Sequence, residues 1–405
     1  MAASATVLSL IKVFSTAATA MTSSLLTFPR LTTLVALVSA SLTLAACNSK
    51  PDNNSVTIGY AGALTGALAH YGKDEENGVR LAIDDLNAQK IVIAGKPVTF
   101  KLQSEDDQAD PRTATNAAQR LVDSNVNAVI GHTTSSTTLP AAILYDRAGI
   151  PLFAPAVTNP KLTQQGYSAT YRLIANDIQQ GRTLADIAAT QLGAKRIAII
   201  DDRSSYGVGL ADEFAKHLTS LGLTPVAHES ASDKDTDFSA QLTRIKGKTP
   251  DLLFFGGNDG QAAALIQQMY NLGLSTKFLA GDGVHTPEFI KLAGPASEGA
   301  ITTLPGLPLE KMPQGTAFAA RFAQKYGAIQ LYAPYYYDAT QIIAKAMQAA
   351  GSTDPKVYAA KLKQTHYAGV TSQIEFDGQG DLKAGLITAY QVKAGQWVEL
   401  PSPTK

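Results

Sequence analysis

The chain has 405 residues, of which 45% are hydrophobic, so it is long enough for two or three domains with cores of their own. Its 34 basic residues equal its 34 acidic residues, and this balance excludes bulk charge as a means of attracting nucleic acid or anionic lipid.

The first 46 residues have the features of a signal peptide. They contain no Asp or Glu and only two basic residues, Lys12 and Arg30. The apolar stretch at residues 31–46 has the length of a signal-peptide core and is short for a membrane span. A start at Met21 would place a compact basic segment directly before this core, so Met21 is a candidate for the true start of translation. We therefore expect an exported protein.

Cys47, the only cysteine of the chain, directly follows this segment. A single cysteine excludes a disulfide within the chain and a thiolate metal site. The sequence Leu-Ala-Ala-Cys that ends at Cys47 resembles the lipobox of bacterial lipoproteins, in which the cysteine thiol carries diacylglycerol. We predict a lipidated Cys47, with residues 47–54 as a polar tether that holds the protein at a membrane surface.

Short β-branched runs then alternate with longer amphipathic stretches, a pattern typical of parallel βαβ units. Strands are expected at residues 56–60, 98–103, 128–131 and 152–154, and in a second series at residues 196–200, 224–228, 252–255 and 277–280. Helices are expected at residues 75–88, 112–124, 137–147, 180–192, 209–221, 238–246 and 261–272.

The two series predict two doubly wound α/β lobes, with a break near residues 175–178. The tail is expected to complete both lobes with helices at 315–326, 334–350 and 355–364, and with a hairpin that pairs 373–376 with 386–392. Lobe 1 would then comprise residues 55–175 plus 306–382, and lobe 2 residues 176–305 plus 383–401. Several crossings between lobes form a hinge, which predicts a ligand held between them.

The sequence contains none of the common catalytic or metal-binding motifs. There is no G-x-S-x-G, H-E-x-x-H, P-loop or G-x-G-x-x-G, and the six histidines lack the spacing of metal ligands. Asp233, Asp235 and Asp237 imitate a calcium loop, but Phe238 stands where that loop needs Gly and Arg244 where it needs Glu. We therefore predict no metal, no cofactor and no enzymatic activity.

Two hydroxyl-bearing loops follow neighbouring strands. The first is GHTTSSTTLP at residues 131–140, and the second is APAVTNP at residues 154–160. A helix start with free N–H groups and hydroxyls can bind a carboxylate or a phosphate, although a plain N-cap would use the same residues. Because both loops lie at the carboxyl ends of parallel strands, we expect them to converge on one ligand site.

These loops belong to a wider set of recognisable stretches: IGYAGALTGALAHYG, DDQADP, VIGHTTSSTTLP, FAPAVTNP, DDRSSYGVGLAD, FFGGND and GDGV. Together they make the chain, from Val56 to about Val398, resemble the leucine/isoleucine/valine-binding protein family, the type I periplasmic amino-acid-binding proteins of ABC transporters. The resemblance implies two lobes joined by a three-stranded hinge, a free amino acid as ligand without any cofactor, and permease subunits in the inner membrane as partners.

The resemblance also implies roles for individual residues. Ser135 would bind the ligand carboxylate together with Thr158 and the backbone of Ala156 in the second loop. Asp282, in GDGV, would pair with the α-ammonium. Two departures put branched-chain specificity in doubt, because Asp282 replaces a longer Glu and Asn258 replaces a Tyr. The ligand-binding residues expected are Tyr71, Ser135, Ser136, Ala156, Thr158, Tyr206, Asn258 and Asp282.

Two other classes of protein stay open. A sensory module that presents its ligand to a signalling receptor would use the same lobes, although no membrane-spanning segment follows the signal peptide in the sequence. An amidase or related hydrolase would need a nucleophile, a base and oxyanion donors gathered in the cleft.

Overall fold

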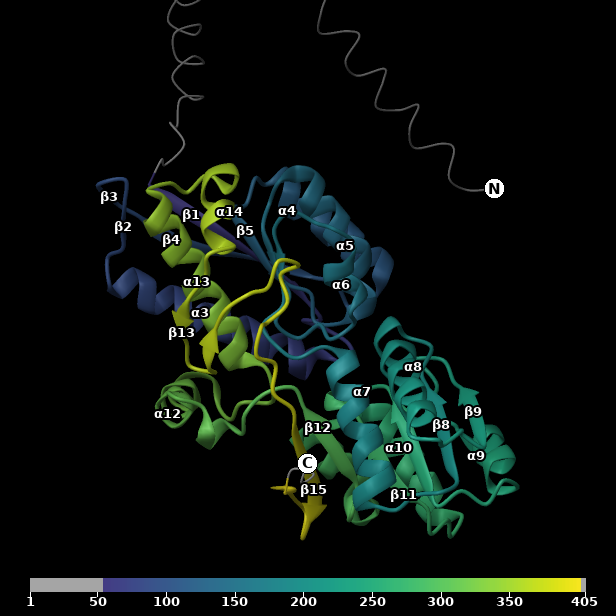
Figure 1. Ribbon diagram of the computed structural model, residues 1–405. Helices are drawn as coiled ribbons and strands as arrows, with labels where there is room; N and C mark the ends of the chain where they lie inside the picture. The colour runs from purple at the N-terminus through teal and green to yellow at the C-terminus, as the bar shows by residue number, and fades with distance from the viewer. Residues whose placement is uncertain (1–53, 402–405) are drawn as a thin grey trace, which may run out of the picture. The chain divides into compact units, whose positions relative to one another are not determined.

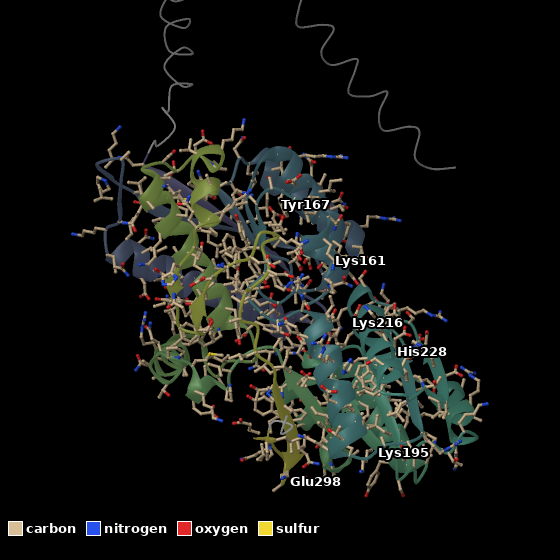
Figure 2. All side chains as sticks on the ribbon, viewed as in Figure 1. Lys161, Tyr167, Lys195, Lys216, His228 and Glu298 are labelled. Atoms are coloured by element: carbon tan, nitrogen blue, oxygen red, sulfur yellow. The ribbon has the colours of Figure 1, made fainter. Side chains whose placement is uncertain are left out.

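The computed structural model describes residues 54–401, which belong to one compact unit of the chain. The segment expected to be a signal peptide and the expected lipidation site, Cys47, lie outside these residues. The described part contains two large sheets, each with helices on both faces (Figure 1). Lys195, Lys216 and Glu298 are exposed and lie on the outside of these elements (Figure 2).

The first sheet has five parallel strands in the order β4-β1-β5-β6-β7. Helices α3 and α13 pack on one face through Val56, Ile58 and Tyr60 of the first strand, whose side chains alternate with Ala61 on the opposite face. The strands are β1 (Ser55–Gly62), β4 (Thr99–Asp106), β5 (Ala128–Gly131), β6 (Leu152–Phe153) and β7 (Thr170–Tyr171). The helices of this half are α3 (Ala69–Ala88), α4 (Pro111–Asp123), α5 (Ser135–Ala148), α6 (Lys161–Gln164), α12 (Gly315–Tyr326), α13 (Ala333–Ala350) and α14 (Pro355–Leu362).

The second sheet has seven strands in the order β16-β15-β12-β11-β10-β8-β9, and β15 alone runs opposite to the others, so that its pairs with β12 and β16 are antiparallel. Helices α7 and α8 cover one face, while α9, α10 and α11 cover the other. The strands are β8 (Ile197–Asp201), β9 (Ala227–Ser230), β10 (Leu252–Gly256), β11 (Lys277–Ala280), β12 (Ile301–Leu304), β15 (Thr388–Lys393) and β16 (Gln396–Glu399). The helices are α7 (Asp177–Asp186), continued by a π-helical turn (Ile187–Gln191), α8 (Ser205–Ser220), α9 (Ser239–Lys246), α10 (Asp259–Asn271) and α11 (Pro287–Ala293).

The chain passes from one sheet half to the other three times. The connections run from β7 to α7, from β12 to α12, and from the strand β14 (Gln373–Ile374) to β15. The lobe boundaries expected from the sequence lie in these three connections. That the two halves move as separate lobes stays a prediction. Each half therefore contains segments that are distant in the sequence.

The hairpin expected between residues 373–376 and 386–392 is wrong. Strand β14 pairs with β13 (Tyr367–Ala368), whereas β15 crosses to the second sheet and pairs with β12 and β16. Val392 of β15 is fully buried in the core of the second half, and this burial favours the long-range pairing over the local one. The prediction from the sequence pattern also missed β7, β12, β16 and α11. It placed the start of α3 at residue 75, six residues after the observed start at Ala69.

Candidate ligand-binding site

A cavity of about 280 Å³ lies between the two sheet halves. Its walls come from loops after β1, β4, β5 and β6 of the first half, and after β8, β9, β10 and β11 of the second. Parallel sheets bind ligands at these carboxyl ends of their strands. Seven of the eight expected ligand-binding residues line the cavity: Tyr71, Ser135, Ser136, Ala156, Tyr206, Asn258 and Asp282.

Thr158 is the expected residue that does not line the cavity. It is 1% exposed, and its hydroxyl has no hydrogen-bond partner among residues 54–401. Its carbonyl accepts a hydrogen bond of 2.9 Å from the Asp177 N–H, at the start of α7. Thr158 therefore lies behind the cavity wall, at the connection between the halves.

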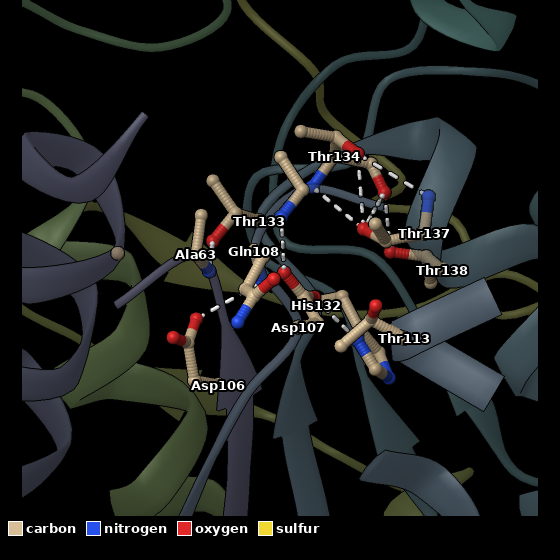
Figure 3. Close-up of polar contacts among 12 residues, drawn as sticks. Ala63, Asp106, Asp107, Gln108, Thr113, His132, Thr133, Thr134, Thr137 and Thr138 are labelled. Atoms are coloured by element: carbon tan, nitrogen blue, oxygen red, sulfur yellow. Dashed lines mark hydrogen bonds and ion pairs between the residues drawn. The ribbon is translucent and has the colours of Figure 1, made fainter. Parts of the chain in front are cut away.

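The start of α5 supplies the polar wall of the first half. Thr134 is the N-cap: its hydroxyl accepts a hydrogen bond of 3.2 Å from the Thr137 N–H, and the Thr137 hydroxyl accepts one of 3.3 Å from the Thr134 N–H (Figure 3). Ser135 is the first residue of the helix and lies in the cavity wall, and the first turn contains no acidic residue. Because Thr134 caps the helix, Ser135 is left to contact an anionic ligand at the positive end of the helix dipole.

Buried polar contacts fix the loop that precedes α5. The Thr133 hydroxyl donates to Glu75 Oε2 at 2.7 Å and accepts from the Ala63 N–H at 3.0 Å. Burial raises the pKa of Glu75 to about 8, while hydrogen bonds from Thr133 and Tyr60 partly oppose the shift. His132 Nδ1 lies 2.7 Å from Asp107 Oδ2, a pair that is fully buried (Figure 3). These buried contacts therefore hold the loop, and with it the start of α5 at Ser135, in one position.

The loop after β6 is also fixed from behind. Arg172 is fully buried, and its guanidinium donates to the carbonyls of Val157 at 2.6 Å and Asn159 at 3.0 Å. The same guanidinium donates to Asp381 Oδ1 at 2.8 Å, in the segment that leads toward β15. Arg172 thus holds the loop that carries Ala156 and links it to the third connection.

Asp282 is the acidic group of the second half and is 2% exposed. Its Oδ1 accepts hydrogen bonds from the Tyr206 hydroxyl at 2.8 Å and from Gln180 Nε2 at 2.9 Å, and its Oδ2 accepts from the Tyr332 hydroxyl. Burial raises the pKa of Asp282, although these three donors oppose the shift. A Cβ at Gly281 would lie 2.6 Å from the Tyr206 hydroxyl, so glycine is needed here for the close approach.

Several hydrogen bonds join the two halves around the cavity. The Tyr71 hydroxyl donates to the Gly283 carbonyl at 2.8 Å, and His70 Nε2 lies 2.7 Å from Asp259 Oδ2. The Ser136 hydroxyl accepts a hydrogen bond of 2.8 Å from the Ser205 N–H. Because these contacts come from α3 and α5 on one side and from α8, α10 and the β11 loop on the other, they close the cavity from more than one direction.

Sequence reasoning missed three buried residues near Asp282. Tyr332 and Gln180 bind its carboxylate from 50 and 102 residues away in the sequence. Asp177 is fully buried, and neither of its carboxylate oxygens has a hydrogen-bond partner in the described part of the chain. Burial, and then the charge of Asp282, raise the pKa of Asp177 to about 8. No local motif marks these residues, because only tertiary packing brings them together.

Within residues 54–401, no group of three or more His, Cys, Asp and Glu side chains is arranged to hold a metal ion. The helices of the same part are also too short or too polar to cross a membrane.

Two α/β halves, linked three times and enclosing a small cavity to which both contribute polar groups, define a bilobal solute-binding protein. The sequence matches the periplasmic binding protein family over residues 55–396, and the chain belongs to this family. The resemblance to the leucine/isoleucine/valine-binding proteins and the fold class predicted from it are thereby confirmed. Membership implies an exported, periplasmic location, in a family that binds substrates.

The similarity extends over most of the chain in each comparison. An amino acid binding protein of Pseudomonas aeruginosa is 35% identical over 350 residues, which are 85% of this chain and 92% of that protein. The leucine-binding protein LivK of Thermotoga maritima is 30% identical with a TM-score of 0.79, and the match covers 85% of this chain and 98% of LivK. A third similar protein is the branched-chain amino acid transporter substrate-binding protein LivJ of Streptococcus pneumoniae, whose structure was solved with isoleucine. It is 26% identical with a TM-score of 0.76, and the match covers 85% of this chain and 100% of LivJ.

Proposed function

We propose that this protein is the extracytoplasmic solute-binding component of an ABC transporter, and that it captures a free amino acid between its two lobes and delivers it to the permease in the inner membrane. The observation that carries the proposal is the placement of Ser135 and Asp282 in one cavity. Ser135 comes from a helix start in the first half, and Asp282 from a strand end in the second.

An amino acid brings a carboxylate and an ammonium, and the cavity must stabilise both, because an unpaired charge removed from water is costly. The hydroxyl of Ser135 and the N–H groups that begin α5 suit the carboxylate. The carboxylate of Asp282 suits the ammonium, and its three hydrogen bonds hold it in place without adding a positive charge. Binding needs no cofactor and no chemical step.

Because the two charged groups of the ligand are bound by different halves, the ligand favours the state in which the halves are joined. The contacts from Tyr71 to Gly283 and from Ser136 to Ser205 would form as the lobes close. The permease would then recognise the closed form. The relatives named above support this function, since they bind amino acids or serve branched-chain amino acid transport by name. They do not favour a signalling module.

We further propose that Cys47 carries a lipid that anchors the protein. The proposal rests on the sequence alone, namely the apolar segment, the two alanines before Cys47 and the polar residues after it.

A thermal-shift screen of the protein from Cys47 onward, against the free amino acids, tests the binding function. A ligand that binds only the folded state raises the melting temperature by mass action. At least one amino acid should raise it in a concentration-dependent way. If none does, and isothermal calorimetry also detects no binding, the proposed function is wrong.

A further inference from the structure

The cavity wall contains few aliphatic side chains. Among the described residues that line it, Leu68 is the only aliphatic one larger than alanine. The start of α10 contributes Asn258 and Gln261, and loops of the two halves contribute Gln108 and Lys234. A buried leucine-sized side chain gains about 1.5–3 kcal/mol only where it leaves water for an apolar environment. Leu68, the alanines and the rings of Tyr71, Tyr206 and Tyr332 supply apolar surface in this cavity, while the start of α10 supplies two amides.

The amide of Asn258 is available to a ligand. Asn258 stands at the N-cap of α10, but its side chain makes no capping hydrogen bond there. A Cβ at Gly283 would lie 3.0 Å from Asn258 Oδ1, so the amide lies beside the residue that follows Asp282. A ligand whose ammonium pairs with Asp282 therefore has its other groups within reach of Asn258.

Gln261 presents a second amide with a fixed orientation. Its Nε2 donates to the Ser232 carbonyl at 2.7 Å and to the Asp235 carbonyl at 3.0 Å. The side-chain oxygen receives no hydrogen bond from residues 54–401 and can accept one. A hydrocarbon side chain placed against Asn258 and Gln261 would remove these groups from water without giving them partners, which costs free energy.

We infer that this protein selects an amino acid whose side chain carries a hydrogen-bonding group over a hydrocarbon side chain of the same size, and that Asn258 is a specificity-determining residue. The inference rests on the proposed function and assigns the substrate class of the same cavity. A site built to hydrogen-bond its substrate rejects the analogue that lacks the polar group more strongly than an apolar pocket rejects an added hydroxyl.

Calorimetry with pairs of similar shape tests the inference: threonine against valine, asparagine against leucine, and glutamine against methionine. In the pair that binds best, the polar member should bind about tenfold or more tightly than the apolar one. Asn258→Leu should reduce that ratio to near one or invert it, whereas Asn258→Ser, which keeps a hydrogen-bonding group, should retain the preference.

Asn271→Leu is the matched control, because Asn271 is exposed at the far end of the same helix. It should change neither the affinities nor the ratio, and the melting temperatures of the unliganded variants report whether each has folded. If the hydrocarbon member of the pair that binds best binds as tightly as its polar partner, or if Asn258→Leu leaves the ratio unchanged, the inference is overturned while the proposed function stands. If no amino acid binds the unaltered protein, the proposed function itself has failed.

Discussion

His70 Nε2 lies 2.7 Å from Asp259 Oδ2, so one pair of titratable side chains joins α3 of the first half to α10 of the second. Asp259 also accepts a hydrogen bond of 2.7 Å from the Thr286 hydroxyl. Burial lowers the pKa of His70, but the hydrogen bond and charge of Asp259, with a contribution from Glu288, outweigh burial and raise it above 6.5.

This pair predicts that ligand affinity depends on pH. If separation of the halves returns the pKa of His70 to its ordinary value, the raised pKa of the joined state favours closure. That contribution is complete below about pH 6.5 and is lost as the pH rises through the raised pKa. Affinity measured by calorimetry should therefore fall as the pH rises above about 6.5, and His70→Gln should reduce this dependence.

His217→Gln is the control for the pH series, because His217 pairs with Asp186 inside the second half. This variant should bind ligand with the same pH profile as the unaltered protein. If His70→Gln keeps the full dependence on pH, another buried group such as Asp177 is responsible, and the contact between His70 and Asp259 does not contribute to closure.

Asp282→Asn should weaken amino-acid binding by about 2–5 kcal/mol, the range for truncating one side of a buried charge pair. The asparagine oxygen can still accept from Tyr206 and Gln180, and its amide can donate to the Tyr332 oxygen, so the site keeps its shape. Calorimetry gives the affinity, and the melting temperature without ligand shows that the fold is intact. Equal affinity in the variant would place the ammonium elsewhere, with Asp259 as the next candidate.

Ser135→Ala should cost less, about 1–3 kcal/mol of binding free energy, because the N–H groups at the start of α5 remain as donors. The adjacent Ser136→Ala provides the comparison, since the Ser136 hydroxyl bonds to the Ser205 N–H rather than to a neighbour in its own half. Ser135→Ala should weaken even a ligand fragment that contains the carboxylate alone. If it weakens only ligands with an ammonium, our assignment of the carboxylate to α5 is incorrect.

Arg172→Met should lower the free energy of unfolding by about 3–5 kcal/mol, the cost of removing one partner from a buried ion pair. The substitution leaves the Val157 carbonyl without its donor, removes one of two donors from the Asn159 carbonyl, and leaves Asp381 without its cationic partner. Denaturant unfolding measures the loss. Arg244→Met, which removes an exposed pair with Glu229, should be nearly neutral. Comparable stability of the two variants would contradict the role given to Arg172.

Cys47→Ser should release the protein from the membrane fraction into the soluble extracytoplasmic fraction, because the hydroxyl cannot take the place of the thiol that carries the lipid. Fractionation followed by immunoblotting measures the distribution. An unchanged distribution would disprove the lipid anchor and would leave the binding function untouched.

The sequence was most informative where local pattern decides structure. The runs at residues 128–131 and 277–280 were predicted with the bounds that β5 and β11 have, because short apolar runs between turn residues predict buried strands. Ser135 and Asp282 could be placed at strand ends for the same reason. Tyr332 and Gln180 could not be found, because long-range packing brings them to Asp282. The pairing of β15 was missed because a local hairpin and a distant sheet edge have the same alternating pattern.

The place of β15 and β16 has a consequence for biogenesis. These last two strands complete the second sheet beside β12, while the helices α12, α13 and α14 just before them pack in the first half. Until residues 388–399 arrive, β12 is an unpaired sheet edge and Val392 is missing from the second core. Neither half can finish folding from the amino-terminal part of the chain alone, so the binding-competent protein forms only after nearly the whole polypeptide has crossed the membrane.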